Sequence, residues 1–240
     1  MSQQITTLSF FRYRSLGTKI WAFGMMQFAH KRLRSISGLR FYRLLGSGKE
    51  RFNPFPDWEV YALLQVWENE TQAKAFFEDH ELFATYRKRS QEHWILYMKH
   101  LMSRGEWGGV NPFVKSNALD NANPYLAVIT RATIKTRLLL RFWKYVPHSQ
   151  EQLWGNPGLI YSKGIGEFPI KQMATFSLWK DKKSLDTFAY QTKAHVKAIG
   201  MTRKLDWYSE ELFSRFQPYK SVGTWEGRNP LSQISLEGES

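Results

Sequence analysis

The histidines are the residues of this chain best suited to bind a transition metal, because the sequence contains no cysteine. The absence of cysteine also excludes thiolate-ligated haem, Cys-ligated iron–sulfur clusters and a cysteine nucleophile. None of the histidines forms a close His-x-His or His-x-Asp pair, and no HExxH motif is present. A metal site therefore needs either one isolated histidine or residues far apart in the sequence. The histidines are His30, His80, His93, His100, His148 and His195.

His195 is the strongest candidate, because it falls on the apolar face of a helix predicted over residues 184–203. At steps of 3, 4, 3 and 4, this face contains Leu185, Phe188, Thr192, His195 and Ile199. The face is expected to pack against a sheet, where an imidazole needs a hydrogen bond or a metal. Two interpretations are open: a core histidine with satisfied hydrogen bonds, which is the more frequent case, and a ligand flanked by Phe188 and Ile199.

His80 is the rival candidate, on a second helix predicted over residues 72–89. It lies at helical spacing from Phe76 and Phe83, which is compatible with an apolar face. Three acidic neighbours favour instead an exposed or ion-paired ring. These neighbours are Glu78, Asp79 and Glu81.

The elements around these histidines recur along the chain. The segments 105–113 and 223–231 share a glycine, a tryptophan, a second glycine, an asparagine and a proline at matching positions. Other landmarks recur in the same order: Gly38-Leu39 and Gly158-Leu159, Trp67 and Trp179, Trp94 and Trp207. Such an ordered series indicates an internal repeat. Counted from the paired tryptophans Trp67 and Trp179, Phe83 occupies the position of His195.

Each half predicts the order β-α-β-β-α-β, which is typical of ferredoxin-like units. Strands are expected over 6–12, 39–45, 60–67, 126–130, 159–163 and 173–179, and after Trp94 and Trp207. Helices are expected over 18–34, 72–89, 135–145 and 184–203. We therefore predict an α+β fold of tandem ferredoxin-like repeats in one chain, whose sheets enclose a central space. The repeats span 1–114 and 125–232, with a linker at 115–124 and a polar tail at 233–240.

Composition allows several partners. Aromatic residues make up 16% of the chain, enough for a large core or for a pocket that holds a flat apolar ligand. The net charge of +13 suits anionic lipid better than nucleic acid, because the basic residues are scattered. We predict a cytoplasmic protein without nucleic acid, since neither a signal peptide nor a membrane-spanning stretch is visible. One predicted helix either packs into the core or rests on a membrane; its large residues are Trp21, Phe23, Met25, Met26 and Phe28, near Lys31 and Arg32.

Several segments together resemble the bacterial spheroidene monooxygenase family, over about residues 8–231. They include 132–143, Lys163-Gly164-Ile165-Gly166-Glu167, Thr175-Phe176-Ser177-Leu178-Trp179, Phe188-Ala189-Tyr190, Trp207-Tyr208 and Gly223-Thr224-Trp225-Glu226-Gly227, with Trp21-Ala22-Phe23 and Gly38-Leu39 in the first half. The resemblance implies a dimeric α+β barrel fold. It also implies haem-dependent oxidation of an acyclic, spheroidene-like carotenoid at C2, to a hydroxyl and then a keto group.

The resemblance further implies that a helix histidine facing the barrel binds the haem iron. We assign this role to His195, with Phe188 and Ile199 beside the haem. The hydrophobic carotenoid is the expected partner, together with an electron donor or peroxide source that the resemblance does not specify. Two alternatives on the same fold stay open: a non-catalytic protein that binds haem or an apolar ligand, and a cofactor-free monooxygenase.

Overall fold

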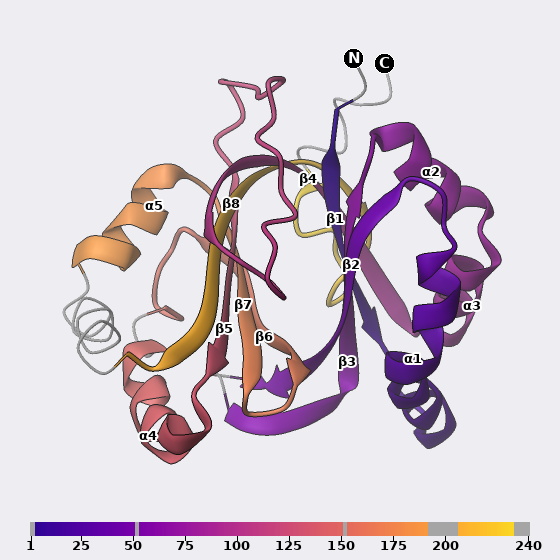
Figure 1. Cartoon of the computed structure of the whole chain (residues 1–240). Coiled ribbons are helices and arrows are strands. Elements are labelled where there is room, and N and C mark those ends of the chain that lie inside the picture. Colours follow the sequence, from indigo (N-terminus) through magenta and orange to yellow (C-terminus); the bar gives the residue numbers. More distant parts are fainter. Residues whose placement is uncertain (1–2, 51–52, 151–152, 192–205, 233–240) are drawn as a thin grey trace.

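Eight antiparallel strands close into one barrel in a computed structural model that describes residues 3–50, 53–150, 153–191 and 206–232. The strands follow the order β1-β3-β2-β6-β7-β5-β8-β4. Helices α1, α2 and α3 cover one side of the barrel, and α4 and α5 lie on the opposite side (Figure 1). The predicted α+β class is confirmed.

Both halves have the predicted element order. The first contains β1 (Ile5–Arg12), α1 (Leu16–Arg34), β2 (Leu39–Lys49), β3 (Asn53–Trp67), α2 (Glu70–Asp79), α3 (Glu81–Arg89) and β4 (Glu92–Gly105). The second contains β5 (Leu126–Ile134), the 3-10 turn η2 (Thr136–Leu138), α4 (Leu139–Gln150), β6 (Leu159–Phe168), β7 (Gln172–Trp179), α5 (Lys182–Asp186), the π-helical turn η3 (Thr187–Gln191) and β8 (Tyr208–Gly223). The predicted linker at 115–124 has neither helix nor strand.

The prediction of one continuous helix over 72–89 is wrong, because the chain breaks at His80. His80 has an extended backbone (φ −80°, ψ 127°), and its Nδ1 accepts the amide of Leu82 at 3.1 Å. An acceptor side chain in this position caps the first turn of α3. Phe76 of α2 and Phe83 of α3 are both buried. The helix predicted over 184–203 begins as α5 and η3; its part beyond residue 191, with His195 and Ile199, lies outside the described residues.

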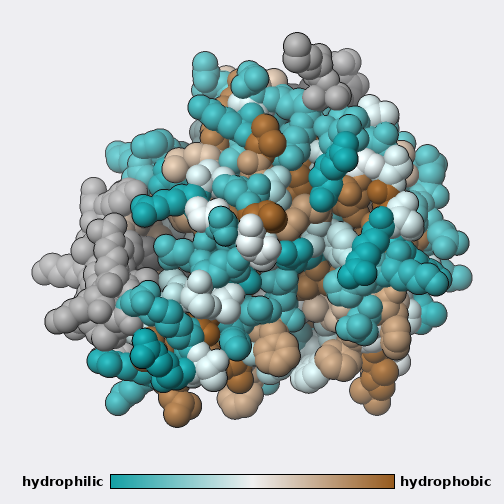
Figure 2. Space-filling model, viewed as in Figure 1, coloured by the Kyte–Doolittle hydropathy of each residue, from teal (hydrophilic) through white to brown (hydrophobic). Residues whose placement is uncertain are grey.

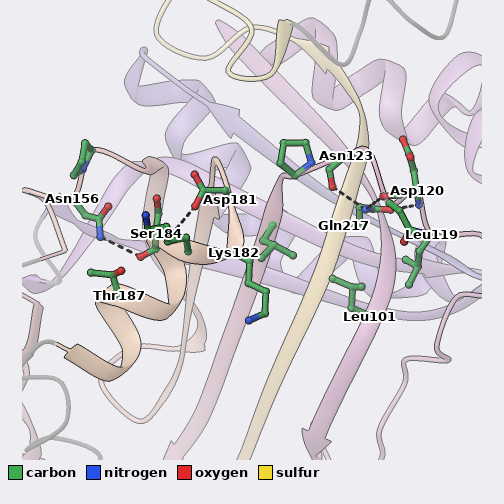
Figure 3. Close-up of a pocket in the computed structure, with 15 residues that line it drawn as sticks. Leu101, Leu119, Asp120, Asn123, Asn156, Asp181, Lys182, Ser184, Thr187 and Gln217 are labelled. Atoms are coloured by element: carbon green, nitrogen blue, oxygen red, sulfur yellow. Dashed lines mark hydrogen bonds between the residues drawn. The ribbon is translucent and has the colours of Figure 1, made fainter.

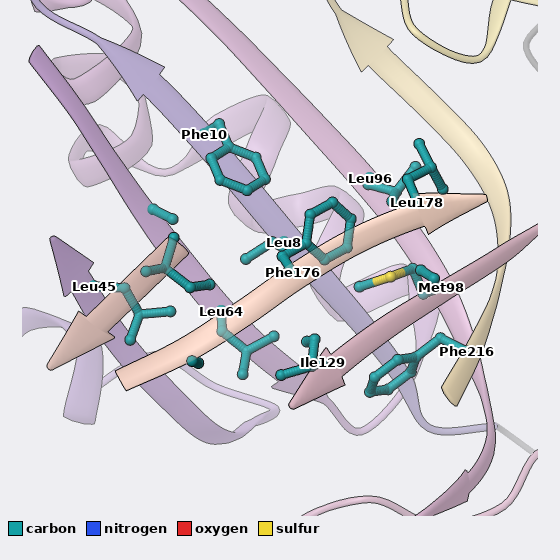
Figure 4. Packing of buried hydrophobic residues seen from close by; sticks show 14 of the residues in the cluster. Leu8, Phe10, Leu45, Leu64, Leu96, Met98, Ile129, Phe176, Leu178 and Phe216 are labelled. Atoms are coloured by element: carbon teal, nitrogen blue, oxygen red, sulfur yellow. The ribbon is translucent and has the colours of Figure 1, made fainter. Parts of the chain in front are cut away.

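The barrel interior is a packed core, which corrects the expectation of an enclosed central space. Alternate residues of the strands point inward and fill it (Figure 4). Phe10 lies at its centre, with its ring centroid 5.6 Å from those of Trp94 and Phe176. Other buried members are Leu8, Leu45, Leu64, Leu96, Met98, Ile129, Leu178 and Phe216. The inside of the barrel is therefore filled by the side chains of the described strands.

The repeated sequence motif builds the same turn twice, at the ends of β4 and β8. Gly105 and Gly223 have φ values of +91° and +85°. A Cβ at either glycine would meet a carbonyl oxygen of the neighbouring strand at 2.1 or 2.3 Å, so glycine is required. Both turns then bury a tryptophan, Trp107 or Trp225, whose amide donates to a carbonyl three residues later.

Candidate functional site

The outer faces of the two half-sheets differ in a way that indicates a ligand site. In the first half, Phe11, Leu44 and Leu63 point outward and pack against α1, α2 and α3. Trp67 pairs with Ile5 and Leu39, and Trp179 pairs with Leu126 and Leu159 in the same way. The strand registers therefore align the two faces residue by residue.

Along this alignment, the second half has small side chains where the first has large ones. The aligned pairs are Phe11 and Ala132, Tyr42 and Ser162, Leu44 and Gly164, and Leu63 and Thr175. We call the part of the outer face formed by Thr130, Ala132, Ser162, Gly164 and Thr175 the recessed face. Ala132 and Ser162 of this face are buried, whereas Thr130 is exposed.

Solvent exposure supports the same interpretation. Thr130 lies in the middle of β5, between Thr175 of β7 and Phe213 of β8, and is nevertheless exposed. The residue aligned with it in the first half, Ser9, is 0% exposed. A central strand position normally loses its contact with water when a helix layer covers it. Thr130 therefore keeps its contact with water in the middle of the recessed face.

Aromatic side chains pack in the same layer as the recessed face, between the second half-sheet and its helices. Phe188 of η3 is buried against Trp179, with ring centroids 5.5 Å apart. Phe142 of α4 packs on Trp207, with centroids 5.5 Å apart. Both pairs belong to the apolar cluster between the second half-sheet and its helices. Phe188 thus lies in the layer where the sequence placed it.

Arg215 brings a positive charge to this layer. It points outward from β8, beside Val128, where the first half has Tyr97. Its Nη2 is 3.7 Å from Asp186 Oδ1, and its guanidinium lies 5.4 Å from the Phe213 ring. Its Nε is buried and has no hydrogen-bond partner among the described residues. A buried guanidinium nitrogen without a partner favours an anionic group nearby.

A groove of about 800 Å³ adjoins the upper end of the same face (Figure 3). Leu126 contributes to the groove and precedes Val128 on the outer face of β5. Gln217 holds one wall in place: its side chain donates to the carbonyl of Asp120 at 2.7 Å and accepts the Asp120 amide at 2.8 Å. Lys182 lies on the other wall, in the first turn of α5. The groove lining combines charged and polar side chains, among them Lys182, with apolar ones such as Leu101 and Leu119.

The histidines with described side chains lie elsewhere. His30 Nδ1 is 3.0 Å from the Tyr42 hydroxyl, His80 caps α3, and the His93 ring packs against Phe83. His100 stacks on Phe113 beside the barrel core. Burial lowers the pKa of His30, His93 and His100. The described residues contain no cluster of three metal-binding side chains, and the His195 site lies outside them.

Comparison with known proteins identifies the family. No protein-family model matches the chain. The spheroidene monooxygenase of Rhodobacter capsulatus is 33% identical over 238 residues, which are 98% of this chain and 99% of that protein. The chain belongs to the spheroidene monooxygenase family. A second spheroidene monooxygenase, from Rubrivivax gelatinosus, is 34% identical over 211 residues, or 88% of this chain and 80% of that protein. The chain is a monooxygenase, and the family prediction made from its sequence is confirmed.

Solved structures support the fold. A crystal structure of an aldoxime dehydratase superposes with a TM-score of 0.61 at 10% identity, over 90% of this chain and 82% of that one. The aldoxime dehydratase OxdRE, in complex with butyraldoxime, gives a TM-score of 0.63 at 8% identity, over 98% and 86%. Identities this low show a common fold and nothing about the reaction.

Proposed function

We propose that the chain is a haem-dependent monooxygenase that oxidises an acyclic, spheroidene-like carotenoid at C2, first to a hydroxyl and then to a keto group. The carotenoid substrate rests on the names of the relatives. The haem rests on one observation, the recessed face, where the second half lacks the bulky side chains that fill the first half. The donor set fits this group, since a lone histidine, aromatic walls and one arginine match an iron, a flat macrocycle and its carboxylates.

The proposal assigns a role to each part of the site. His195 would bind the iron, with Ile199 and Phe188 beside the macrocycle. Arg215, with Lys182 of the adjoining groove, would hold the carboxylate edge, because guanidinium–carboxylate pairs are strong and directional. Haem, when bound, supplies the oxygen-activating chemistry.

The remaining described residues orient the substrate and exclude water. The buried aromatic pairs of the same layer would give an apolar environment to a polyene, which dissolves poorly in water. Thr130 and Thr175 keep the middle of the face free of large side chains. The protein therefore restricts which carbon of the chain reaches the reactive centre, and the residues on this face determine that selectivity.

We further propose that the fold arose by tandem duplication of a ferredoxin-like unit, with repeats at 1–114 and 125–232 joined by 115–124. The two equivalent glycine–tryptophan turns and the matching strand registers support this proposal. After duplication, the first copy would have filled its outer face with side chains, with Phe83 at the position of His195. The second copy would have kept the ligand site.

Carotenoid conversion by the purified chain tests the function. We expect an acyclic carotenoid in detergent micelles to be oxidised by protein loaded with haem and supplied with a reductant and oxygen, or with peroxide. The apo-protein should be inactive. Equal oxidation without haem would favour a cofactor-free monooxygenase. A haem complex that never converts carotenoid under either condition would favour a ligand-binding protein.

A further inference from the structure

Large apolar side chains are exposed at one end of the barrel, where β1 and β5 end and α1 and α4 begin. In the first turns of α1, Leu16 is 75% exposed, Ile20 63% and Phe23 57%. The inner face of the same helix packs on the core through Trp21, Met25 and Met26. One face of the helix therefore packs on the core, and a second apolar face is exposed.

Other elements extend this apolar end across the molecule. Trp58, at the start of β3, is 51% exposed, and its ring centroid lies 5.3 Å from that of Phe23. In the second half, Leu140 at the start of α4 is 92% exposed. Phe168 and Ile170, at the turn between β6 and β7, are 62% and 47% exposed. Figure 2 shows hydrophobic side chains along the lower edge of the molecule, where Figure 1 places α4, the β6–β7 turn and α1.

Basic residues accompany these apolar ones. Arg14 precedes α1 and is exposed, and Arg137 and Arg141 flank Leu140 and are exposed. Lys171 follows Ile170. Cations beside protruding apolar side chains match the anionic headgroups and the acyl region of a lipid leaflet.

Acidic residues at this end are mostly neutralised by partners. Asp57 is 2.7 Å from Lys163 Nζ. Glu59 is likewise 2.7 Å from Lys19 Nζ, and Glu50 is exposed. The exposed charge of this end is thus predominantly positive, in keeping with the net charge of +13 for the chain.

We infer that this end docks on an anionic lipid bilayer, with the starts of α1, β3 and α4 and the β6–β7 turn at headgroup depth. The apolar side chains come from separate elements and protrude together. A planar lipid surface can contact all of them at once, whereas a peptide or a single helix would reach only some. The inference is independent of haem and concerns a surface away from the groove beside α5.

Vesicle sedimentation of the full chain tests the inference. Binding to phosphatidylcholine vesicles that contain phosphatidylglycerol should exceed binding to pure phosphatidylcholine and should decrease with salt. Phe23→Glu and Leu140→Glu should each lower the partition coefficient about tenfold. Arg141→Glu should lower binding to the anionic vesicles only.

Val114→Glu is the matched control, because Val114 is 62% exposed and lies near Gln4, at the opposite end of β1. It should bind vesicles like the wild type. Quenching of tryptophan fluorescence by brominated lipid should fall in Trp58→Phe, which reports insertion without removing an apolar side chain. Equal partition of Leu140→Glu and the wild type would overturn the inference. A second result would also overturn it: a wild type that does not bind vesicles but forms a dimer, which Leu140→Glu converts to a monomer. A second copy of the chain would then cover this face.

Discussion

Replacing Thr130 with phenylalanine should fill the recessed face and leave the fold intact. The side chain of Thr130 is exposed, so a larger group at this position enters open space rather than packed core. Phenylalanine is also favoured in the middle of a strand, and the scale of β-strand propensities spans about 1 kcal/mol. A change of that size shifts the melting temperature of a chain of this length by about 2–4 °C.

The effect on haem binding should be larger. A rigid macrocycle over the recessed face would have to share its space with the new ring, and overpacking a well-fitted site costs about 1–3 kcal/mol. Such a penalty corresponds to an affinity about 5- to 150-fold weaker. The variant should therefore lose haem affinity while its melting temperature changes little. This combination is expected of a side chain that blocks a ligand site.

Haem titration of the apo-protein, followed by visible absorption, measures the affinity, and calorimetry measures the melting temperature. Val222→Phe is the matched control, because Val222 is 38% exposed and lies in the part of β8 that pairs with the first half. It should bind haem like the wild type. An unchanged haem affinity in Thr130→Phe would refute the placement of the site on the recessed face.

Three further predictions concern single side chains. Arg215→Leu should weaken haem binding by about 10- to 150-fold, since a hydrogen bond to a charged group is worth about 1.5–3 kcal/mol, and Arg215→Lys should restore part of the loss in the same titration. His80→Ala should lower the free energy of unfolding by about 1 kcal/mol through loss of the α3 cap, with haem affinity unchanged. Denaturation and haem titration distinguish this result from a ligand role. His80→Asn should recover the stability, because asparagine also caps helices. Burial lowers the pKa of His100, so below pH of about 6.5 the unfolded chain binds more protons than the folded one, and stability should fall as the pH decreases. The free energy of unfolding, measured from neutral to acidic pH, should decrease less steeply in His100→Phe than in the wild type. An identical decrease in both proteins would contradict this assignment.

Most helices and strands could be predicted from the sequence, because the residue pattern of each segment indicates its own secondary structure. The β-rich apolar runs that end in Trp67 and Trp179 predicted β3 and β7, and the repeated glycine–tryptophan motif indicated the internal repeat. The break at His80 was missed, since the apolar spacing from Phe76 to Phe83 continues unchanged through the cap. The filled interior was also missed, because the closure of the barrel depends on the pairing of β2 with β6 and of β4 with β8.

The candidate site was only partly accessible. The sequence pointed to the helix of Phe188 and to the second half, which is where the recessed face lies. Arg215 and Thr130 were missed, because nothing in their local sequence distinguishes them from ordinary strand residues. The signal was nevertheless present in the repeat: Leu63 aligns with Thr175, and this loss of size becomes meaningful once the register shows that both point outward.

The absorption spectrum of His195→Gly with added haem tests the central claim most directly. We expect the wild type to give a Soret band at one haem per chain, and the variant to lose it. Free imidazole should restore the band, because the ligand then enters the space that the side chain has left. His148→Gly should keep the wild-type spectrum. A wild-type spectrum in His195→Gly without imidazole, or no haem band in any of these proteins, would contradict the account.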